Sequence, residues 1–81
     1  NIPKPNPAMA IKAMNDLGVD KENCVMIGDT INDIGLGVNA GITSIGVTWG
    51  YNDKNLLLSA GANYLVDDAN QLNTLMKEIF N

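Results

Sequence analysis

The sequence predicts an α/β domain in which a parallel sheet of about three strands is flanked by helices in three layers, a Rossmann-like arrangement. Two observations predict this fold class. Short apolar or β-branched segments alternate with segments of helical periodicity, in the order helix and then strand–helix three times. The connections between them are short, and strands that are joined through helices pair in parallel.

The first helix is expected to begin at Asn6-Pro7, because an N-cap residue precedes a proline at the first helical position. It is expected to end at Gly18, a residue type that readily adopts the left-handed conformation of a helix stop. Apolar residues recur at helical spacing along it and predict a buried stripe (Ala10, Ala13, Met14 and Leu17).

A strand and a second helix follow. Val25–Ile27 is an apolar run that ends at Gly28 and predicts a strand buried on both faces. The second helix is expected over Asn32–Ala40, with Gly41 as its stop. A G-x-G-x-x-x-G series within Gly35–Gly41 indicates close helix packing, since a dinucleotide site would need its glycines at a strand–helix turn.

The rest of the chain continues the alternation. Thr43–Thr48 is rich in β-branched residues and predicts a second strand, and Trp49–Asp53 predicts a loop whose aromatic residues pack on the core. A short helix over Lys54–Ala60 and a third strand over Tyr64–Val66 follow. Asp67-Asp68 is expected to cap the last helix, which carries an apolar stripe (Leu72, Leu75, Met76 and Ile79).

The composition limits both partners and chemistry. The chain has 81 residues, a formal charge of -4, no histidine and one cysteine, Cys24, and its five positive residues are all lysines. The acidic balance argues against a nucleic-acid partner, and the apolar runs are too short to span a membrane. A lone cysteine favours a reducing, cytoplasmic location. Chemistry must therefore use carboxylates, lysine, hydroxyls, backbone amides and a metal ion.

The segment Gly28–Asp33 contains the strongest candidates for site residues. Asp29 follows a buried strand, at the sheet edge where open α/β folds bind ligands, and Asp33 lies four residues later on the same side. Two such carboxylates suit Mg²⁺. Gly28 permits close backbone approach, and Thr30 and Asn32 offer further oxygen contacts. The residues alone also allow a second interpretation, in which Asp29 merely ends a strand and Asp33 complements the helix dipole.

Several motifs in sequence order resemble one family. Lys4–Pro7 is similar to a K-P-x-P segment, Leu17–Val19 to the end of the helix after it, and Gly28–Asp33 to a G-D-x-x-x-D acidic motif. Asn39–Gly41 and Val47–Tyr51 fit downstream positions. Together they resemble the haloacid dehalogenase-like (HAD) superfamily of Mg²⁺-dependent phosphatases, and within it the phosphoglycolate phosphatase-like branch.

The resemblance implies roles for three residues. Asp29 would coordinate Mg²⁺ directly, and Asp33 would act through a metal-bound water or orient the other ligands. Lys4 would neutralise the phosphoryl group and the aspartate that receives it, as the only kind of cation that this chain offers. The substrate would be a small phosphorylated metabolite, hydrolysed through an aspartyl-phosphate.

The chain departs from that family in one large respect. The family's nucleophile and general acid/base are two aspartates in a D-x-D motif on an earlier strand, and that motif is absent here, as is the cap region that selects the substrate. Residues 1–81 are therefore expected to form a single partial domain, the C-terminal half of the core, without phosphatase activity of its own.

Three strands also leave a hydrophobic sheet edge unpaired, which natural proteins avoid. The expected partner at this edge is the missing N-terminal half of the same protein or a neighbouring chain, as in a swapped dimer of a proteolytic fragment. The alternative to an enzyme half is a non-enzymatic α/β module that binds a metal or nucleotide or pairs with a partner.

Overall fold

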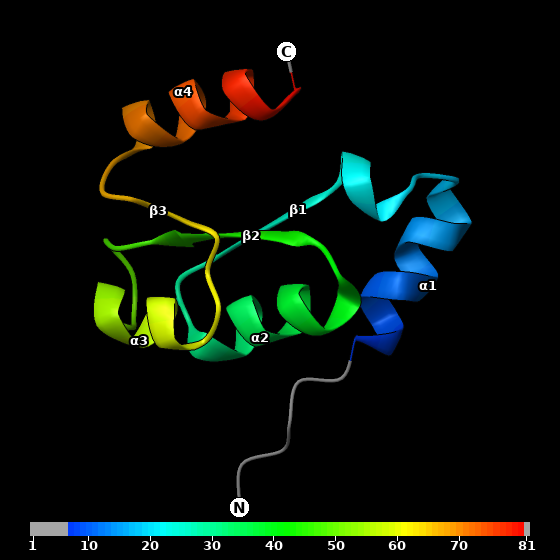
Figure 1. Cartoon of the computed structure of the whole chain (residues 1–81), viewed down its shortest axis with the longest axis horizontal. Coiled ribbons are helices and arrows are strands. Elements are labelled where there is room, and N and C mark those ends of the chain that lie inside the picture. Colours follow the sequence, from blue (N-terminus) through cyan, green and yellow to red (C-terminus); the bar gives the residue numbers. More distant parts are fainter. Residues whose placement is uncertain (1–6, 81) are drawn as a thin grey trace, which may run out of the picture.

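The computed structural model describes residues 7–80. The elements follow the predicted order (Figure 1): α1 (Ala8–Leu17), a 3-10 turn η1 (Lys21–Asn23), β1 (Val25–Gly28), α2 (Ile31–Ala40), β2 (Thr43–Val47), α3 (Lys54–Ser59), β3 (Tyr64–Val66) and α4 (Ala69–Phe80). The three strands form one sheet in the order β1-β2-β3, and both pairings are parallel. Helices α2 and α3 lie on one face of the sheet and α4 on the other (Figure 1). The predicted fold class is confirmed.

The central strand β2 presents different residues to its two faces, because successive side chains point to opposite sides. Ile45 and Val47 are buried on the side of α4, in a cluster with Val66. On the other side Ser44 is fully buried, and its hydroxyl donates to the carbonyl of Ile34 in α2 (3.4 Å). A small residue on this face allows α2 to approach the sheet closely.

Close packing of α2 on the sheet depends on Gly37, in agreement with the prediction from the glycine spacing in residues 35–41. A β-carbon at Gly37 would lie 2.7 Å from Cβ of Met26 in β1 and would also collide with the hydroxyl of Ser44. Both α1 and α2 end at the predicted glycines, Gly18 and Gly41, which have φ of 69° and 75°. This left-handed conformation is the one that glycine adopts without steric cost.

The starts of the first two helices differ from prediction by one residue, whereas α3 begins at Lys54 as predicted. The first helix begins at Ala8 with Pro7 as its N-cap, and the predicted cap Asn6 lies outside the described residues. The second begins at Ile31, because the Thr30 hydroxyl accepts a hydrogen bond from the Asp33 amide and so serves as the cap. The predicted cap at the last helix is confirmed: Asp68 Oδ1 accepts from the Gln71 amide at 2.8 Å.

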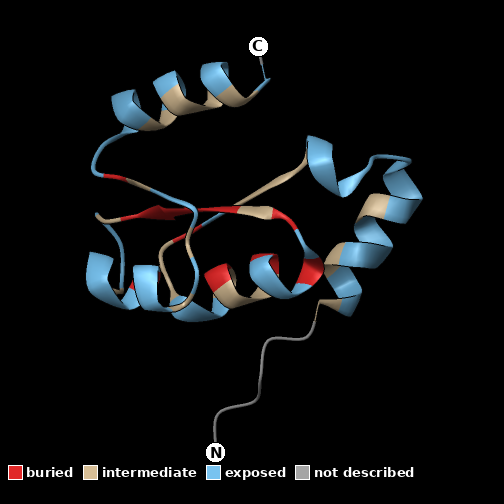
Figure 2. Ribbon diagram, viewed as in Figure 1, coloured by how far each residue is buried: buried red, intermediate tan, exposed pale blue. Residues whose placement is uncertain are grey.

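The predictions of burial for the first strand and the first helix were wrong. The first strand is not buried on both faces, since Val25 and Met26 are half-buried and Ile27 is 41% exposed. Helix α4 packs mainly on β3, and Ile27 on β1 remains partly exposed. The stripe on α1 is not buried either: none of its residues is, and Leu17 is 76% exposed. Figure 2 shows burial concentrated in β2 and the inner side of α2, with α1 and α4 largely exposed.

The aromatic residues of the loop after β2 were also expected to pack on the core. Instead Trp49 is 53% exposed and Tyr51 is 83% exposed, since this loop lies at the carboxyl end of the sheet, beyond the helices. Within residues 7–80, no helix combines the length and the apolar character needed to cross a membrane.

Candidate functional site

The parallel pairing brings the carboxyl ends of the three strands to one edge of the sheet. Asp29 follows β1, Thr48 follows β2 and Asp67 follows β3. Thr48 and Asp67 engage each other, because the threonine hydroxyl donates to Asp67 Oδ1 at 2.8 Å. Asp29, half-buried, lies at the junction of β1 and α2, and its carboxylate faces the loop after β2.

Asp33 reaches the same junction from the first turn of α2. Its side chain folds back over the end of β1, so that a β-carbon at Gly28 would lie 2.9 Å from Asp33 Oδ2. Its amide donates to the Thr30 hydroxyl at 3.1 Å, which fixes the helix start. Both predicted carboxylates therefore belong to the β1–α2 junction, where Gly28 leaves space for the Asp33 side chain and Asp29 follows this glycine in the chain.

The loop that follows β2 contacts Asp29 through residues 50–52. The Tyr51 amide donates to Asp29 Oδ2 at 3.0 Å, and the Asn52 amide donates to the Asp29 carbonyl at 2.9 Å. Asn52 Oδ1 accepts from the Ile31 amide at 2.9 Å. A β-carbon at Gly50 would lie 2.5 Å from the Asp29 carboxyl carbon.

These loop residues were not predicted as site residues from the sequence, because the aromatic residues Trp49 and Tyr51 were expected only to pack on the core. A usable signal was present: adjacent parallel strands bring their following loops together, so the loop after β2 must meet the loop after β1.

The other predicted site residues are Thr30, Asn32 and Lys4. Thr30 acts as the cap of α2 through its hydroxyl, and Asn32 is exposed on the first turn of that helix. Lys4 lies outside the described residues.

The donor set at this junction fits Mg²⁺. Among residues 7–80, the one ion pair joins Lys12 and Asp16 on α1, so no described lysine neutralises Asp29 or Asp33. Among the described residues, the Asp29 carboxylate accepts one hydrogen bond, at Oδ2. Its other oxygen, Oδ1, is therefore left for a ligand. The described part of the chain also contains no cluster of three or more metal-binding side chains. Mg²⁺ commonly binds one or two carboxylates and takes its other ligands from water and phosphate, so two carboxylates suffice.

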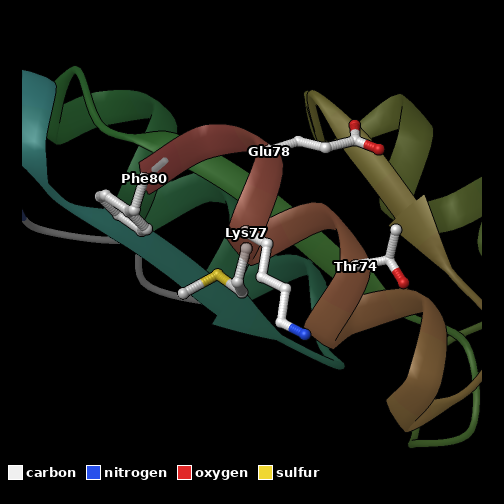
Figure 3. Close-up of a pocket in the computed structure, with 5 residues that line it drawn as sticks. Thr74, Lys77, Glu78 and Phe80 are labelled. Atoms are coloured by element: carbon white, nitrogen blue, oxygen red, sulfur yellow. The ribbon is translucent and has the colours of Figure 1, made fainter.

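A hollow of about 730 Å³ lies elsewhere, along the second half of α4. Figure 3 shows Thr74, Lys77, Glu78 and Phe80 around it, and Met76 also lines it. None of its lining residues belongs to the β1–α2 junction. It is an open, mainly apolar surface of the helix.

Comparisons with known proteins identify relatives of this chain. Residues 1–72 match the family model described as "HAD-hyrolase-like". The chain is 44% identical over 69 residues to a phosphoglycolate phosphatase of Colwellia psychrerythraea, covering 85% of this chain and 30% of that protein. It is 32% identical over 77 residues to the pyrophosphatase PpaX of Oceanobacillus iheyensis, covering 95% of this chain and 36% of that one.

A solved structure matches as well. The HAD family hydrolase of Deinococcus radiodurans, crystallised with bound phosphate and sodium, superposes with a TM-score of 0.82 at 28% identity. The match covers 94% of this chain and 35% of that one.

The chain therefore belongs to the HAD-like hydrolase family. The resemblance to the phosphoglycolate phosphatase-like branch is also confirmed. The chain spans about a third of the length of the curated relatives that it matches.

Proposed function

We propose that the protein to which this chain belongs hydrolyses the phosphate monoester of a small metabolite, with Mg²⁺ and through an aspartyl-phosphate. The observation that supports the proposal is the β1–α2 junction: Asp29 follows Gly28, the Asp33 side chain packs on that glycine, and no described lysine pairs with either carboxylate. Phosphatases among the relatives, and the phosphate bound in the Deinococcus radiodurans relative, support the substrate class.

In this proposal Asp29 holds the ion through Oδ1, while the Tyr51 amide keeps Oδ2 in place. Asp33 orients a metal-bound water or the other ligands from the helix start. The ion, when bound, would neutralise charge on the phosphoryl oxygens during transfer. Lys4 would add a second positive charge on the phosphoryl group.

The nucleophile and the partner form the second part of the proposal. Within the described sheet β1 pairs only with β2, so its other edge has unpaired backbone groups, and Ile27 on it is 41% exposed. A strand that pairs in parallel beside β1 would end next to Asp29, where it could supply an aspartate. We propose that this strand belongs to the missing N-terminal half of the same protein or to a neighbouring chain.

A titration of the chain with Mg²⁺, followed by calorimetry, tests the metal site. We expect binding in the native chain, loss of binding in Asp29→Asn, and native binding in Asp16→Asn. The last variant is the matched control, because it removes the same charge from α1, where Asp16 pairs with Lys12. Equal weakening by both variants would indicate only a loss of general negative charge and would contradict the site.

The open edge also favours a second candidate, a module whose role is to pair with a partner strand. Molecular mass in solution tests the pairing with a neighbouring chain. A dimer that Ile27→Lys converts to a monomer would support pairing at the β1 edge, since a charged edge resists strand addition. A dimer that survives the substitution would place the contact on another surface.

A further inference from the structure

Asn52 is bonded to both ends of the short segment that carries the first carboxylate. Its backbone amide donates to the carbonyl of Asp29, and its side-chain oxygen accepts from the amide of Ile31, each at 2.9 Å. The two bonds lie on either side of Thr30. Asn52 thereby ties the end of β1 to the first residue of α2.

The residues just before Asn52 fix the carboxylate itself. The Tyr51 amide donates to Asp29 Oδ2 at 3.0 Å, and Gly50 packs so closely on the Asp29 side chain that a β-carbon would lie 2.5 Å from its carboxyl carbon. The ring of Tyr51 is 83% exposed, so its contribution here comes from the backbone. Three consecutive residues thus contact Asp29 from one side.

We propose that Asn52 is a positioning residue for Asp29: its side-chain bond to Ile31 holds the loop 50–52 against the carboxylate and directs Oδ1 toward the ligand. The inference rests on the proposed magnesium site. Its physical basis is that the groups around a metal ligand set the ligand's orientation, and their loss typically lowers metal affinity about 10-fold or more.

The chain contains a matched control at the opposite end of the sheet. Asn63 precedes β3 and makes the same pair of bonds: its amide donates to the Ser44 carbonyl, and its Oδ1 accepts from the Ser44 amide, both at 2.8 Å. Ser44 lies near the amino end of β2, away from Asp29. Replacing Asn63 removes the same kind of bond from the fold without touching the junction.

The experiment compares Asn52→Ala, Asn52→Asp and Asn63→Ala with the native chain by Mg²⁺ calorimetry and amide hydrogen exchange. We expect Asn52→Ala to weaken Mg²⁺ binding about 10-fold and to remove exchange protection from the amides of Ile31 and Tyr51. Asn63→Ala should leave both properties native and expose only the Ser44 amide. Asn52→Asp keeps the acceptor and should restore protection and binding.

Two results would overturn the inference. One is equal weakening of Mg²⁺ binding by Asn52→Ala and Asn63→Ala, which would make Asn52 a general stabiliser. The other is native protection of the Tyr51 amide in Asn52→Ala, which would mean that the carboxylate is held without Asn52. If the native chain binds no Mg²⁺, the proposed metal site fails, and the Tyr51 amide still decides whether Asn52 positions Asp29.

Discussion

The side chain of Asp33 packs directly on Gly28, the last residue of β1, with no space for a β-carbon between them. This contact links the two halves of the acidic motif. Asp29 directly follows Gly28 at the end of β1. Asp33, in the first turn of α2, packs its side chain on the same glycine. The glycine of the motif, Gly28, therefore has a steric role, because the Asp33 side chain occupies the space that a β-carbon would need.

Gly28→Ala should destabilise the chain by about 1–3 kcal/mol, as overpacking of a filled site does. The added methyl group must displace Asp33, so Mg²⁺ binding should weaken as well. Urea unfolding measures the first effect and calorimetry the second. In an Asp33→Gly background the same substitution should cost less, because the clashing side chain is gone; an equal cost in both backgrounds would rule out the contact.

Gly37→Ala should also destabilise the chain, although alanine is the better helix former by about 1 kcal/mol. The methyl group would lie 2.7 Å from Met26 Cβ and would press on the buried Ser44 hydroxyl. The expected result is a lower urea midpoint and a separation of α2 from the sheet. A raised midpoint would mean that helix propensity outweighs packing at this position.

The chain alone should not hydrolyse p-nitrophenyl phosphate in the presence of Mg²⁺. Its sequence has no D-x-D pair to supply the nucleophile and the acid, and Asp67-Asp68 is engaged in the start of α4. Phosphate release by the purified chain measures this. Turnover that disappears in Asp29→Asn would show that the chain holds a complete catalytic site.

Much of the fold could be predicted because its signals are local. Gly18 and Gly41 mark helix ends through their own backbone conformation, and Asp68 caps a helix that begins at the next residue. Asp29 and Asp33 were predicted as site residues from spacing within one strand–helix unit together with the resemblance of Gly28–Asp33 to the family's acidic motif.

The features that could not be predicted depend on residues far apart in the sequence. The bond from Ile31 to Asn52 joins positions 21 residues apart, and nothing near Asn52 indicates it. The burial of Ile27 failed as a prediction because it depends on what lies along the second edge of β1, and within the described sheet β1 pairs only with β2.

The unpaired edge of β1 links the docking of a further strand to the onset of activity. The strand that precedes Asp29, β1, is also an edge strand of the described sheet. Any strand that docks there would saturate the backbone groups of β1 and reach the acidic junction in the same movement. Assembly and activation would then be one event, so the appearance of activity on mixing two complementary pieces would track the rate of docking, without a separate maturation phase.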